Sequence, residues 1–225
     1  MGLTVWSVCT GDKYPPAYVY ALRDAVRKHL TGHYVFKCVT EHDLPGIDCH
    51  PPPTLYRSWW DKLGLFWLAR GPSLYFDLDV VITGSLDYLV PYTQNQLAAP
   101  ANWAQSGHGG IQSSVMAWSG IWHDPYLNLN HAVDSKRLWG DQEYLWEMLG
   151  DNWVRLPGIY SYKYHCRNQA PPDDMAVCVF HGDPKPHQVT DEWISRYTST
   201  LHYHIKSSTG RGSKRDLTGT LSLLK

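Results

Sequence analysis

Between residues 73 and 82 the chain reads Ser-Leu-Tyr-Phe-Asp-Leu-Asp-Val-Val-Ile, an apolar and aromatic run that two carboxylates interrupt. Such a run is typical of a buried strand, in which an unpaired carboxylate would cost roughly several kcal/mol of desolvation. We therefore expect Asp77 and Asp79 where the strand ends, in contact with water or a cation. Because hard divalent ions prefer oxygen ligands, the pair predicts a metal site, with two hydrated aspartates as the alternative.

Two strand–helix pairs precede this run. Residues 3–9 and 34–40 predict strands, and Pro15-Pro16 begins a helix between them. Its core positions recur every four residues at Tyr18, Leu22, Val26 and Leu30. Residues 58–70 predict a second helix, with Ser58 as its N-cap and with Trp59, Leu63 and Trp67 toward the core. The order β-α-β-α-β predicts a parallel sheet with a ligand over its carboxyl edge.

The second half predicts fewer regular elements. Strands are expected within residues 111–118, 153–156 and 175–180, and a helix begins near Asp141, which is expected to cap it. The last strand runs into the turn His181-Gly182-Asp183-Pro184-Lys185-Pro186-His187. The chain contains neither GxGxxG nor GxxxxGK[ST], the signatures of a dinucleotide fingerprint and a P-loop. With no repeat and no clear linker, we expect one integrated α/β domain.

Composition indicates a globular protein. Hydrophobic residues make up 43% of the 225 residues. The sequence contains no run of about 18 apolar residues, so no membrane span is predicted. The first residues lack the basic and apolar parts of a signal peptide. Five scattered cysteines without a CxxC or CxxH pair indicate free thiols in a reducing compartment, so a cytoplasmic location and no structural zinc are expected.

The formal charge of −1 argues against an obligate nucleic-acid binder, but the charge is unevenly distributed. Residues 206–225 form a Ser/Thr/Gly-rich basic tail with five basic residues and one acidic residue. Such a tail is either solvated or an arm that approaches a phosphate-bearing acceptor. The eleven tryptophans and fifteen tyrosines suit a large core and also the aromatic walls of a sugar- or base-binding cleft.

Three separated stretches share one chemistry. Asp77 and Asp79 can hold a metal ion, His181 at another strand end can add a nitrogen ligand, and Lys185 offers a positive charge. A metal ion and a lysine facing one pocket suit a diphosphate leaving group, on which negative charge builds as its bond breaks. An Asp/Asp/His set favours Mn²⁺, with Mg²⁺ as a substitute.

With these motifs in order, residues 4–190 resemble the GT-A glycosyltransferases, in particular the glycogenin and lipopolysaccharide-galactosyltransferase group and short bacterial and phage glycosyltransferases. The resemblance rests on the DxD stretch 74–81, Trp60-Asp61-Lys62-Leu63, Ser113-Ser114-Val115-Met116, Gly140-Asp141-Gln142 and the turn 181–187. It implies a GT-A, Rossmann-like fold with a mainly parallel sheet flanked by helices. Residues 1–84 would be the nucleotide-binding half and residues 85–205 the acceptor-binding half.

The resemblance also implies a role for individual residues. Asp77, Asp79 and His181 would bind Mn²⁺, and Gly182 and Lys185 would contact the diphosphate. The nucleotide would be bordered by Thr10, Gly11, Tyr14, Lys62, Asp77 and Leu78, with Tyr14 as a stacking platform for the base. Lys62 would approach either the nucleotide or an Asp of the DxD. Asp141 and Gln142 would lie beside the donor sugar or the acceptor and, with Lys185, act in catalysis. The chain departs from the family in the His-to-Lys spacing and in having His187 in place of a tryptophan, which leaves the acceptor side open.

The implied activity is transfer of a sugar, of the hexosyltransferase type, from a nucleotide sugar such as a UDP-sugar to an acceptor hydroxyl. The resemblance implies retention of configuration, with the leaving phosphate taking the acceptor proton. Lipopolysaccharide or another glycan, protein, and hydroxymethylated phage DNA stay open as acceptors. The corresponding location is the cytosol of a bacterium or of a phage-infected host.

Two other interpretations fit part of the pattern. Residues 76–82 also match the nucleophile motif of haloacid-dehalogenase phosphatases, in which Asp77 would attack phosphorus and Asp79 act as general acid. That family carries the motif on its first strand, however, whereas here a full β-α-β-α precedes it. A non-catalytic nucleotide-sugar-binding protein would suit the aromatic content but has no need for the metal carboxylates, histidine and lysine.

Overall fold

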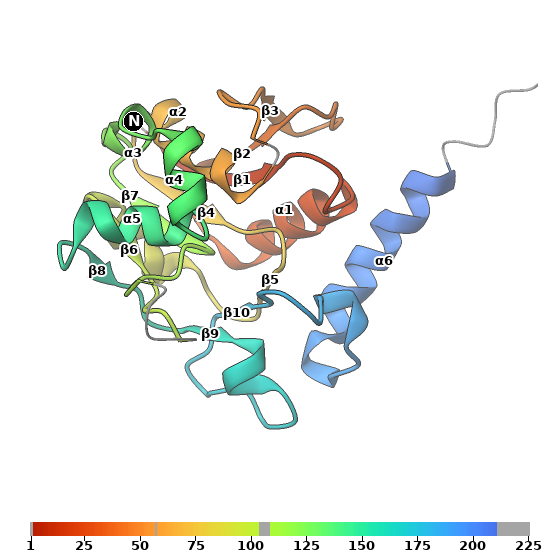
Figure 1. Ribbon diagram of the computed structural model, residues 1–225. Helices are drawn as coiled ribbons and strands as arrows, with labels where there is room; N and C mark the ends of the chain where they lie inside the picture. Colours follow the sequence, from red (N-terminus) through yellow and green to blue (C-terminus); the bar gives the residue numbers. More distant parts are fainter. Residues whose placement is uncertain (1, 57, 104–108, 211–225) are drawn as a thin grey trace, which may run out of the picture.

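The computed structural model describes residues 2–56, 58–103 and 109–210 (Figure 1). The basic tail expected from residue 206 therefore falls mostly outside the described residues. Its first part, 206–210, completes helix α6, whereas residues 211–225 are not described. In the described residues, no helix combines the length and the hydropathy needed to cross a membrane.

Seven strands form the larger sheet, in the order β3-β2-β1-β4-β7-β6-β8. The first four are mutually parallel, and β7 runs antiparallel to both β4 and β6. The strands are β1 Leu3–Cys9, β2 Tyr34–Thr40, β3 Asp48–His50, β4 Ser73–Phe76, β6 Ala98–Ala99, β7 Val115–Trp118 and β8 Val154–Arg155. The mainly parallel sheet predicted from the β-α-β-α-β order is confirmed.

The run from residue 73 to residue 82 is two strands rather than one. After β4 the chain turns at Asp77-Leu78-Asp79 and continues as β5 (Val80–Ile82), which belongs to a second sheet. There β5 pairs antiparallel with β10 (Val177–Val179), and β10 pairs parallel with β9 (Ile159–Ser161). The carboxylates therefore sit where the chain passes from one sheet to the other, as their desolvation cost requires.

Helices cover both faces of the larger sheet (Figure 1). The longer helices are α1 Ala17–His29, α5 Asp141–Leu149 and α6 Ser195–Gly210. The shorter ones are η1 Trp59–Leu63, α2 Gly64–Leu68, η2 Asp87–Gln94, α3 Asp124–Leu127, α4 His131–Arg137, η3 Tyr162–Cys166, η4 Pro186–Gln188 and η5 Glu192–Ile194. Helix α6 lies beside α1, where His204 Nε2 is 2.9 Å from Asp24 Oδ2.

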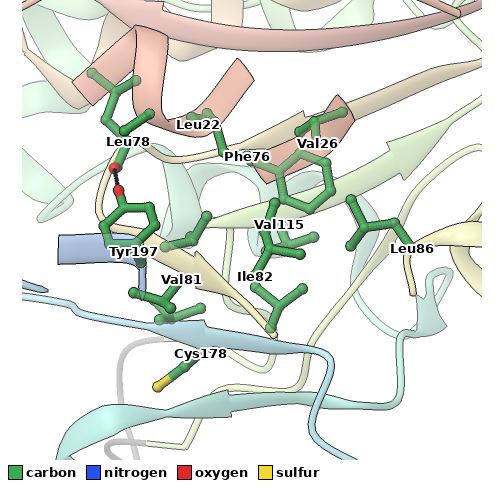
Figure 2. Packing of buried hydrophobic residues seen from close by; sticks show 14 of the residues in the cluster. Leu22, Val26, Phe76, Leu78, Val81, Ile82, Leu86, Val115, Cys178 and Tyr197 are labelled. Atoms are coloured by element: carbon green, nitrogen blue, oxygen red, sulfur yellow. Dashed lines mark hydrogen bonds between the residues drawn. The ribbon is translucent and has the colours of Figure 1, made fainter. Parts of the chain in front are cut away.

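Strand alternation divides the core into two parts. Leu74 and Phe76 face α1, α6 and the second sheet, whereas Tyr75 between them faces η1, α2 and α5. Figure 2 shows the first part, in which Phe76 packs near Leu22 and Val26 of α1. The hydroxyl of Tyr197 on α6 also donates to the carbonyl of Leu78, 3.4 Å away. Strand β4 and the turn after it are thus packed from both sides.

The predicted helix at residues 58–70 is confirmed at its start and at Leu63, which is buried, and wrong at two of its three facing residues. Ser58 Oγ accepts from the backbone N–H of Trp60, so the cap is present. Trp59 and Trp67, however, are 52% and 40% exposed. The first turn is a 3-10 helix and the next is α-helical, and every residue from Trp60 to Phe66 is buried. Burial in this segment therefore follows neither a three-residue nor a four-residue period.

Candidate active site

A cavity of about 700 Å³ opens at the edge of the sheet where β1 and β4 end. Most of the predicted site residues line it, although they come from distant parts of the chain. These residues are Thr10, Tyr14, Lys62, Asp77, Leu78, Asp79, Asp141, Gln142, His181 and Gly182. The other two predicted residues do not line the cavity. Gly11 donates its N–H to the Glu41 carboxylate at 2.7 Å, and Lys185 is held just beside the cavity.

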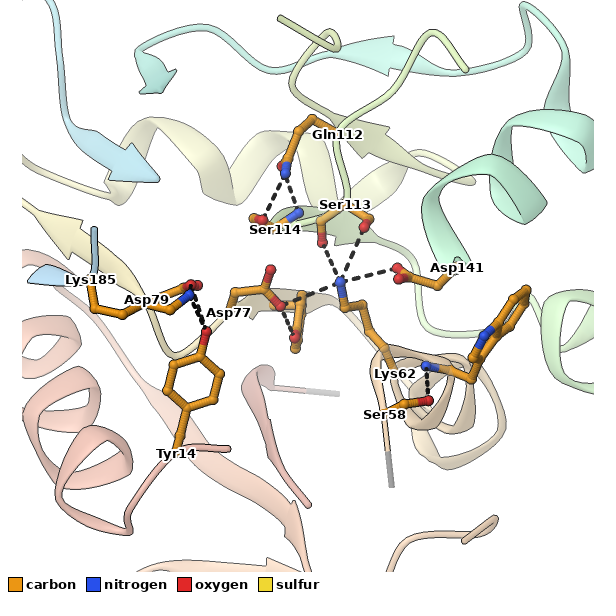
Figure 3. Close-up of polar contacts among 12 residues, drawn as sticks. Tyr14, Ser58, Lys62, Asp77, Asp79, Gln112, Ser113, Ser114, Asp141 and Lys185 are labelled. Carbon is orange, nitrogen blue, oxygen red and sulfur yellow. Dashed lines mark hydrogen bonds and ion pairs between the residues drawn. The ribbon is translucent and has the colours of Figure 1, made fainter. Parts of the chain in front are cut away.

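Lys62 forms the centre of a buried charge cluster on one wall (Figure 3). Its ammonium nitrogen lies 3.0 Å from Asp141 Oδ2 and 3.3 Å from Asp77 Oδ1, and it donates to the Ser113 hydroxyl at 3.1 Å. Only 5% of Lys62 is exposed. The hydroxyl of Tyr75 donates to Asp77 from beneath. The cluster joins η1, β4 and α5 through one cation.

The pKa values in this cluster depend on whether burial or the neighbouring charges and hydrogen bonds have the larger effect. Burial alone would raise the pKa of Asp77, but Lys62 and the hydroxyl groups of Ser114 and Tyr75 outweigh it and hold that pKa below its usual value. Burial raises the pKa of Asp141 despite Lys62. Burial would lower the pKa of Lys62, but the charges of Asp141 and Asp77 raise it. The lysine therefore stays charged and bridges the two carboxyl groups.

Asp141 does not cap helix α5, which corrects the prediction. It is the first helical residue, and the cap position belongs to Gly140. A Cβ at Gly140 would lie 2.7 Å from the Trp59 indole, so only glycine allows this close approach. The Asp141 side chain instead turns to Lys62. There its buried Oδ2 forms the 3.0 Å ion pair with the ammonium group.

Asp79 is held by a second set of contacts (Figure 3). Its Oδ2 accepts from the Tyr14 hydroxyl and from the Lys185 ammonium group, each at 2.6 Å, and Lys185 also donates to the Tyr14 oxygen at 2.8 Å. Burial and the charge of Asp77 raise the pKa of Asp79, against the effect of Lys185. Tyr14 thus contacts Asp79 through its hydroxyl, and the Lys185 ammonium nitrogen lies 5.1 Å from its ring centroid.

His181 lies in a different wall. Its ring stacks near the rings of Trp103 and Tyr164, whose centroids are 6.0 Å and 5.7 Å away. Its Nε2 is 2.6 Å from Ser161 Oγ, a bond between the end of β10 and the end of β9. Burial, together with the charges of Lys163 and Lys185, lowers the pKa of His181 to about 4. The imidazole is therefore neutral near pH 7.

The predicted metal ligands share the cavity without forming one cluster. Within residues 2–56, 58–103 and 109–210, no three His, Cys, Asp or Glu side chains group as a metal site. Asp77, which is partly exposed, and Asp79, which is buried, still fit a divalent cation as two neighbouring carboxylate ligands. Mg²⁺ in particular is commonly held by one or two carboxylates together with substrate phosphates. The Asp pair therefore fits a cation whose other ligands are oxygens of a diphosphate. His181 instead forms a hydrogen bond with Ser161.

Sequence reasoning missed several residues of the cavity. Lys163 and Tyr164 come from η3, and Trp59 and Trp139 flank the segment that carries Asp141. Trp139 is 77% exposed, which hydrophobic periodicity cannot forecast. Lys163 is two residues beyond β9, and a polar residue just past a strand end was the available signal. Other missed wall residues include Lys13, Asn102, Trp103, Gln112 and Glu143.

Comparison with known proteins identifies the fold. No family model and no curated protein matches the chain. Galactosyltransferase LgtC, solved with donor and acceptor sugar analogs, aligns with a TM-score of 0.63 and 14% identity, over 89% of this chain and 95% of LgtC. The glycosyltransferase GlyE of Streptococcus pneumoniae TIGR4 aligns with a TM-score of 0.66 and 15% identity, over 98% of this chain and 66% of GlyE.

The bifunctional glycosyltransferase WbbM has a TM-score of 0.63 and 12% identity, over 92% of this chain and 51% of WbbM. At such low identities the likeness shows the fold and leaves residue roles undetermined. The chain has the GT-A fold of these glycosyltransferases, as the resemblance implied.

Proposed function

We propose that the protein is a metal-dependent glycosyltransferase that moves a sugar from a nucleotide sugar, such as a UDP-sugar, to an acceptor hydroxyl. The observation that carries the proposal is the meeting of Asp77, Asp79, Lys62 and Asp141 with the turn at Gly182 in one cavity, at the edge of a GT-A sheet. Ligands of open α/β sheets bind at this carboxyl edge. The five free cysteines favour a reducing cytosol, bacterial or phage-infected, as its location.

The Asp pair would hold Mn²⁺ or Mg²⁺. A divalent cation bound there would neutralise negative charge on the diphosphate. Asp77 stays ionised because Lys62 lowers its pKa, so one full carboxylate is ready at neutral pH. Asp79 is paired with Lys185. Exchange of that ammonium group from Asp79 to the diphosphate would free the second carboxylate when the donor binds.

In the reaction, the bond between the sugar C1 and the diphosphate oxygen breaks, and the electron pair leaves with the diphosphate. The acceptor oxygen forms the new bond to C1, and its proton passes to the departing phosphate oxygen. Lys185 and the N–H groups of the Gly182 turn would stabilise the charge that develops on the diphosphate. The resemblance to retaining enzymes supports attack by the acceptor oxygen on the face of the sugar that the diphosphate leaves. It also supports proton transfer to the phosphate without a separate protein base.

Asp141 is suited to orient the donor sugar. Its buried Oδ2 lies at the cavity wall, where the Lys62 ammonium group holds it at 3.0 Å. A carboxylate oxygen can accept more than one hydrogen bond, so a sugar hydroxyl could donate to Asp141 while the ion pair stays in place. Lys62 fixes the position of this carboxylate and is itself too deeply buried to reach far into the cavity. Gln142 follows on the same cavity wall.

A neutral glycan is the acceptor class that the cavity favours. Exposed indole faces at Trp59 and Trp139 suit the apolar faces of sugar rings. A polyanion such as hydroxymethylated DNA would require a groove of unpaired cations, whereas the cavity also carries Asp141 and Glu143. Hydroxymethylated DNA and protein hydroxyls stay in the acceptor screen as the other outcomes.

The proposal is tested by a donor screen that measures free nucleoside diphosphate. We expect release from UDP-sugars or GDP-sugars with Mn²⁺, its loss in EDTA and its recovery when Mn²⁺ or Mg²⁺ is added back. The same protein is then given p-nitrophenyl phosphate with Mg²⁺. Phosphate release from that ester, without hydrolysis of any nucleotide sugar, would instead establish the phosphatase with Asp77 as nucleophile. Tight donor binding without turnover on any acceptor would identify a binding protein.

A further inference from the structure

Lys163 is a cation that the roles assigned so far leave unused. It is the second residue of η3, far in sequence from the Asp pair, and it lines the same cavity. Its ammonium nitrogen is 2.9 Å from the point where Gly182 would carry a Cβ. The charge therefore lies directly over the turn that follows β10, where Lys185 is also attached.

The charge of Lys163 is uncompensated. Its ammonium group forms no hydrogen bond, ion pair or ring contact with any residue in the described part of the chain. The other lysines of the site are all engaged. Lys62 bridges Asp77 and Asp141, Lys185 binds Asp79, and Lys13 lies over the rings of Tyr14 and Trp59.

The surroundings of Lys163 repel a cation. His181, beside it, has its pKa lowered to about 4 by burial and by the charges of Lys163 and Lys185. Like charges near a partly buried surface raise the potential of the cavity and attract anions. Gly182 has a φ of 67°, and its lack of a side chain leaves the space that the ammonium group occupies. Glycine is thus required here both for the turn and for the cation.

We propose that Lys163 is a second ammonium ligand of the donor diphosphate, placed over Gly182 so that it and Lys185 bind the leaving group from two sides. The inference rests on the proposed function and adds a residue to it. A diphosphate offers several anionic oxygens, so Lys185 and Lys163 can each bind a separate one. The ligand class is an organic or inorganic diphosphate, because the cation faces the turn rather than the aromatic wall of Trp59 and Trp139.

The test is calorimetric titration of the full chain with UDP, inorganic pyrophosphate and uridine, in the presence of Mg²⁺. Lys163→Met is expected to weaken the binding of UDP and of pyrophosphate about tenfold or more, as loss of a charged hydrogen bond does. Uridine binding should not change. Lys163→Arg should keep affinity within about threefold, since the charge is retained. Lys136→Met, on exposed α4, is the matched control and should bind like the parent protein.

A double-mutant cycle sharpens the test. Gly182→Ala inserts a methyl group where the ammonium group lies, so it should displace Lys163 as well as strain the turn. Removing Lys163 should then cost much less in the Gly182→Ala background than in the parent. Additive losses would overturn the placement of the cation over Gly182.

Three further results would overturn the proposal, and they separate its failure from that of the proposed function. If Lys163→Met binds UDP and pyrophosphate within twofold of the parent, while the parent releases UDP from donor, only the role of Lys163 is lost. An unchanged UDP affinity with a raised KM for acceptor would move Lys163 to the acceptor. If the parent chain binds neither UDP nor pyrophosphate, the diphosphate site itself and the proposed function fail together.

Discussion

The two walls of the cavity treat charge in opposite ways. On the Lys62 wall, one buried ammonium group is matched by Asp77 and Asp141 and by the Ser113 hydroxyl. On the Lys163 wall, an ammonium group lies over a glycine with no counter-ion among the described residues. A buried charge without a partner is strongly destabilising, whereas a partly exposed charge is solvated by water until a ligand binds. The first wall, that of Lys62, therefore stabilises the arrangement of the site, and the second wall, that of Lys163, is suited to binding an anion.

The largest expected effect is at Asp79, which stands between the two walls. Asp79→Ala should lower metal-dependent hydrolysis of the nucleotide-sugar donor by about 100- to 1,000-fold, because it removes a carboxylate that no neighbour replaces. The measurement is free UDP released at saturating Mn²⁺. Asp43→Ala, an exposed aspartate after β2, is the control and should keep full activity. A fully active Asp79→Ala protein would contradict the proposed role of the Asp pair in metal binding.

Lys62→Met tests whether the first wall is structural. It leaves Asp77 and Asp141 buried without a cation, and should lower the free energy of unfolding by about 3–5 kcal/mol. Lys163→Met should change it by less than about 1 kcal/mol. Urea unfolding of the two variants gives both values. The contrast between the walls would be wrong if both lysines cost the same.

A second substitution isolates the charge effect. Adding Asp141→Asn to Lys62→Met removes one of the two stranded carboxylates, so the double variant should be more stable than Lys62→Met alone. Failure of this rescue in urea unfolding would mean that Lys62 acts through packing of its aliphatic part rather than through its charge.

The second wall should respond to acid. The pKa of His181 is lowered from 6.5 to about 4 in the folded chain, so the unfolded chain binds a proton there at a higher pH than the folded chain. The contribution of His181 to stability is therefore complete above about pH 6.5 and is lost as pH falls toward 4. Urea midpoints in EDTA between pH 7.5 and 4.5 should fall less steeply in His181→Gln than in the parent. Identical slopes would contradict the prediction.

The smallest expected effect is at the hydrogen bond that attaches His181 to β9. Ser161→Ala removes the hydroxyl 2.6 Å from Nε2 and should lower the free energy of unfolding by about 1 kcal/mol. Ser135→Ala on α4, whose hydroxyl only donates to the carbonyl one turn back, serves as control in the same urea series. A cost as large as that of Lys62→Met would place a structural centre in the second wall as well.

Local patterns in the sequence predicted elements whose cause is local. The strands at residues 3–9 and 34–40 are found with the expected bounds, and Tyr18, Leu22, Val26 and Leu30 are buried as predicted. In the segment 58–70, Leu63 is buried as predicted, whereas Trp59 and Trp67 are exposed. The segment is buried continuously from Trp60 to Phe66, which apolar spacing alone does not predict.

The candidate site was predictable in its carboxylates and only partly in their partners. A pair of aspartates inside an apolar run indicates a functional site, because burying an unpaired carboxylate would cost too much free energy. The contact of Lys62 with Asp77 agrees with the expectation carried over from the resemblance. Nothing in the sequence indicated that Asp141 would turn away from its helix cap toward Lys62, since that choice depends on a lysine some 80 residues earlier in the chain.

By itself, the sequence determined the order of strands and helices, the mainly parallel sheet and the place where its carboxylates interrupt a strand. Only the tertiary structure decided how the charges are shared: Lys62 between Asp77 and Asp141, Lys185 on Asp79, His181 on Ser161 and Lys163 over Gly182. The physical reason is range. Periodicity and capping act within a few residues, whereas a buried charge takes whichever partner the fold brings within about 3–4 Å.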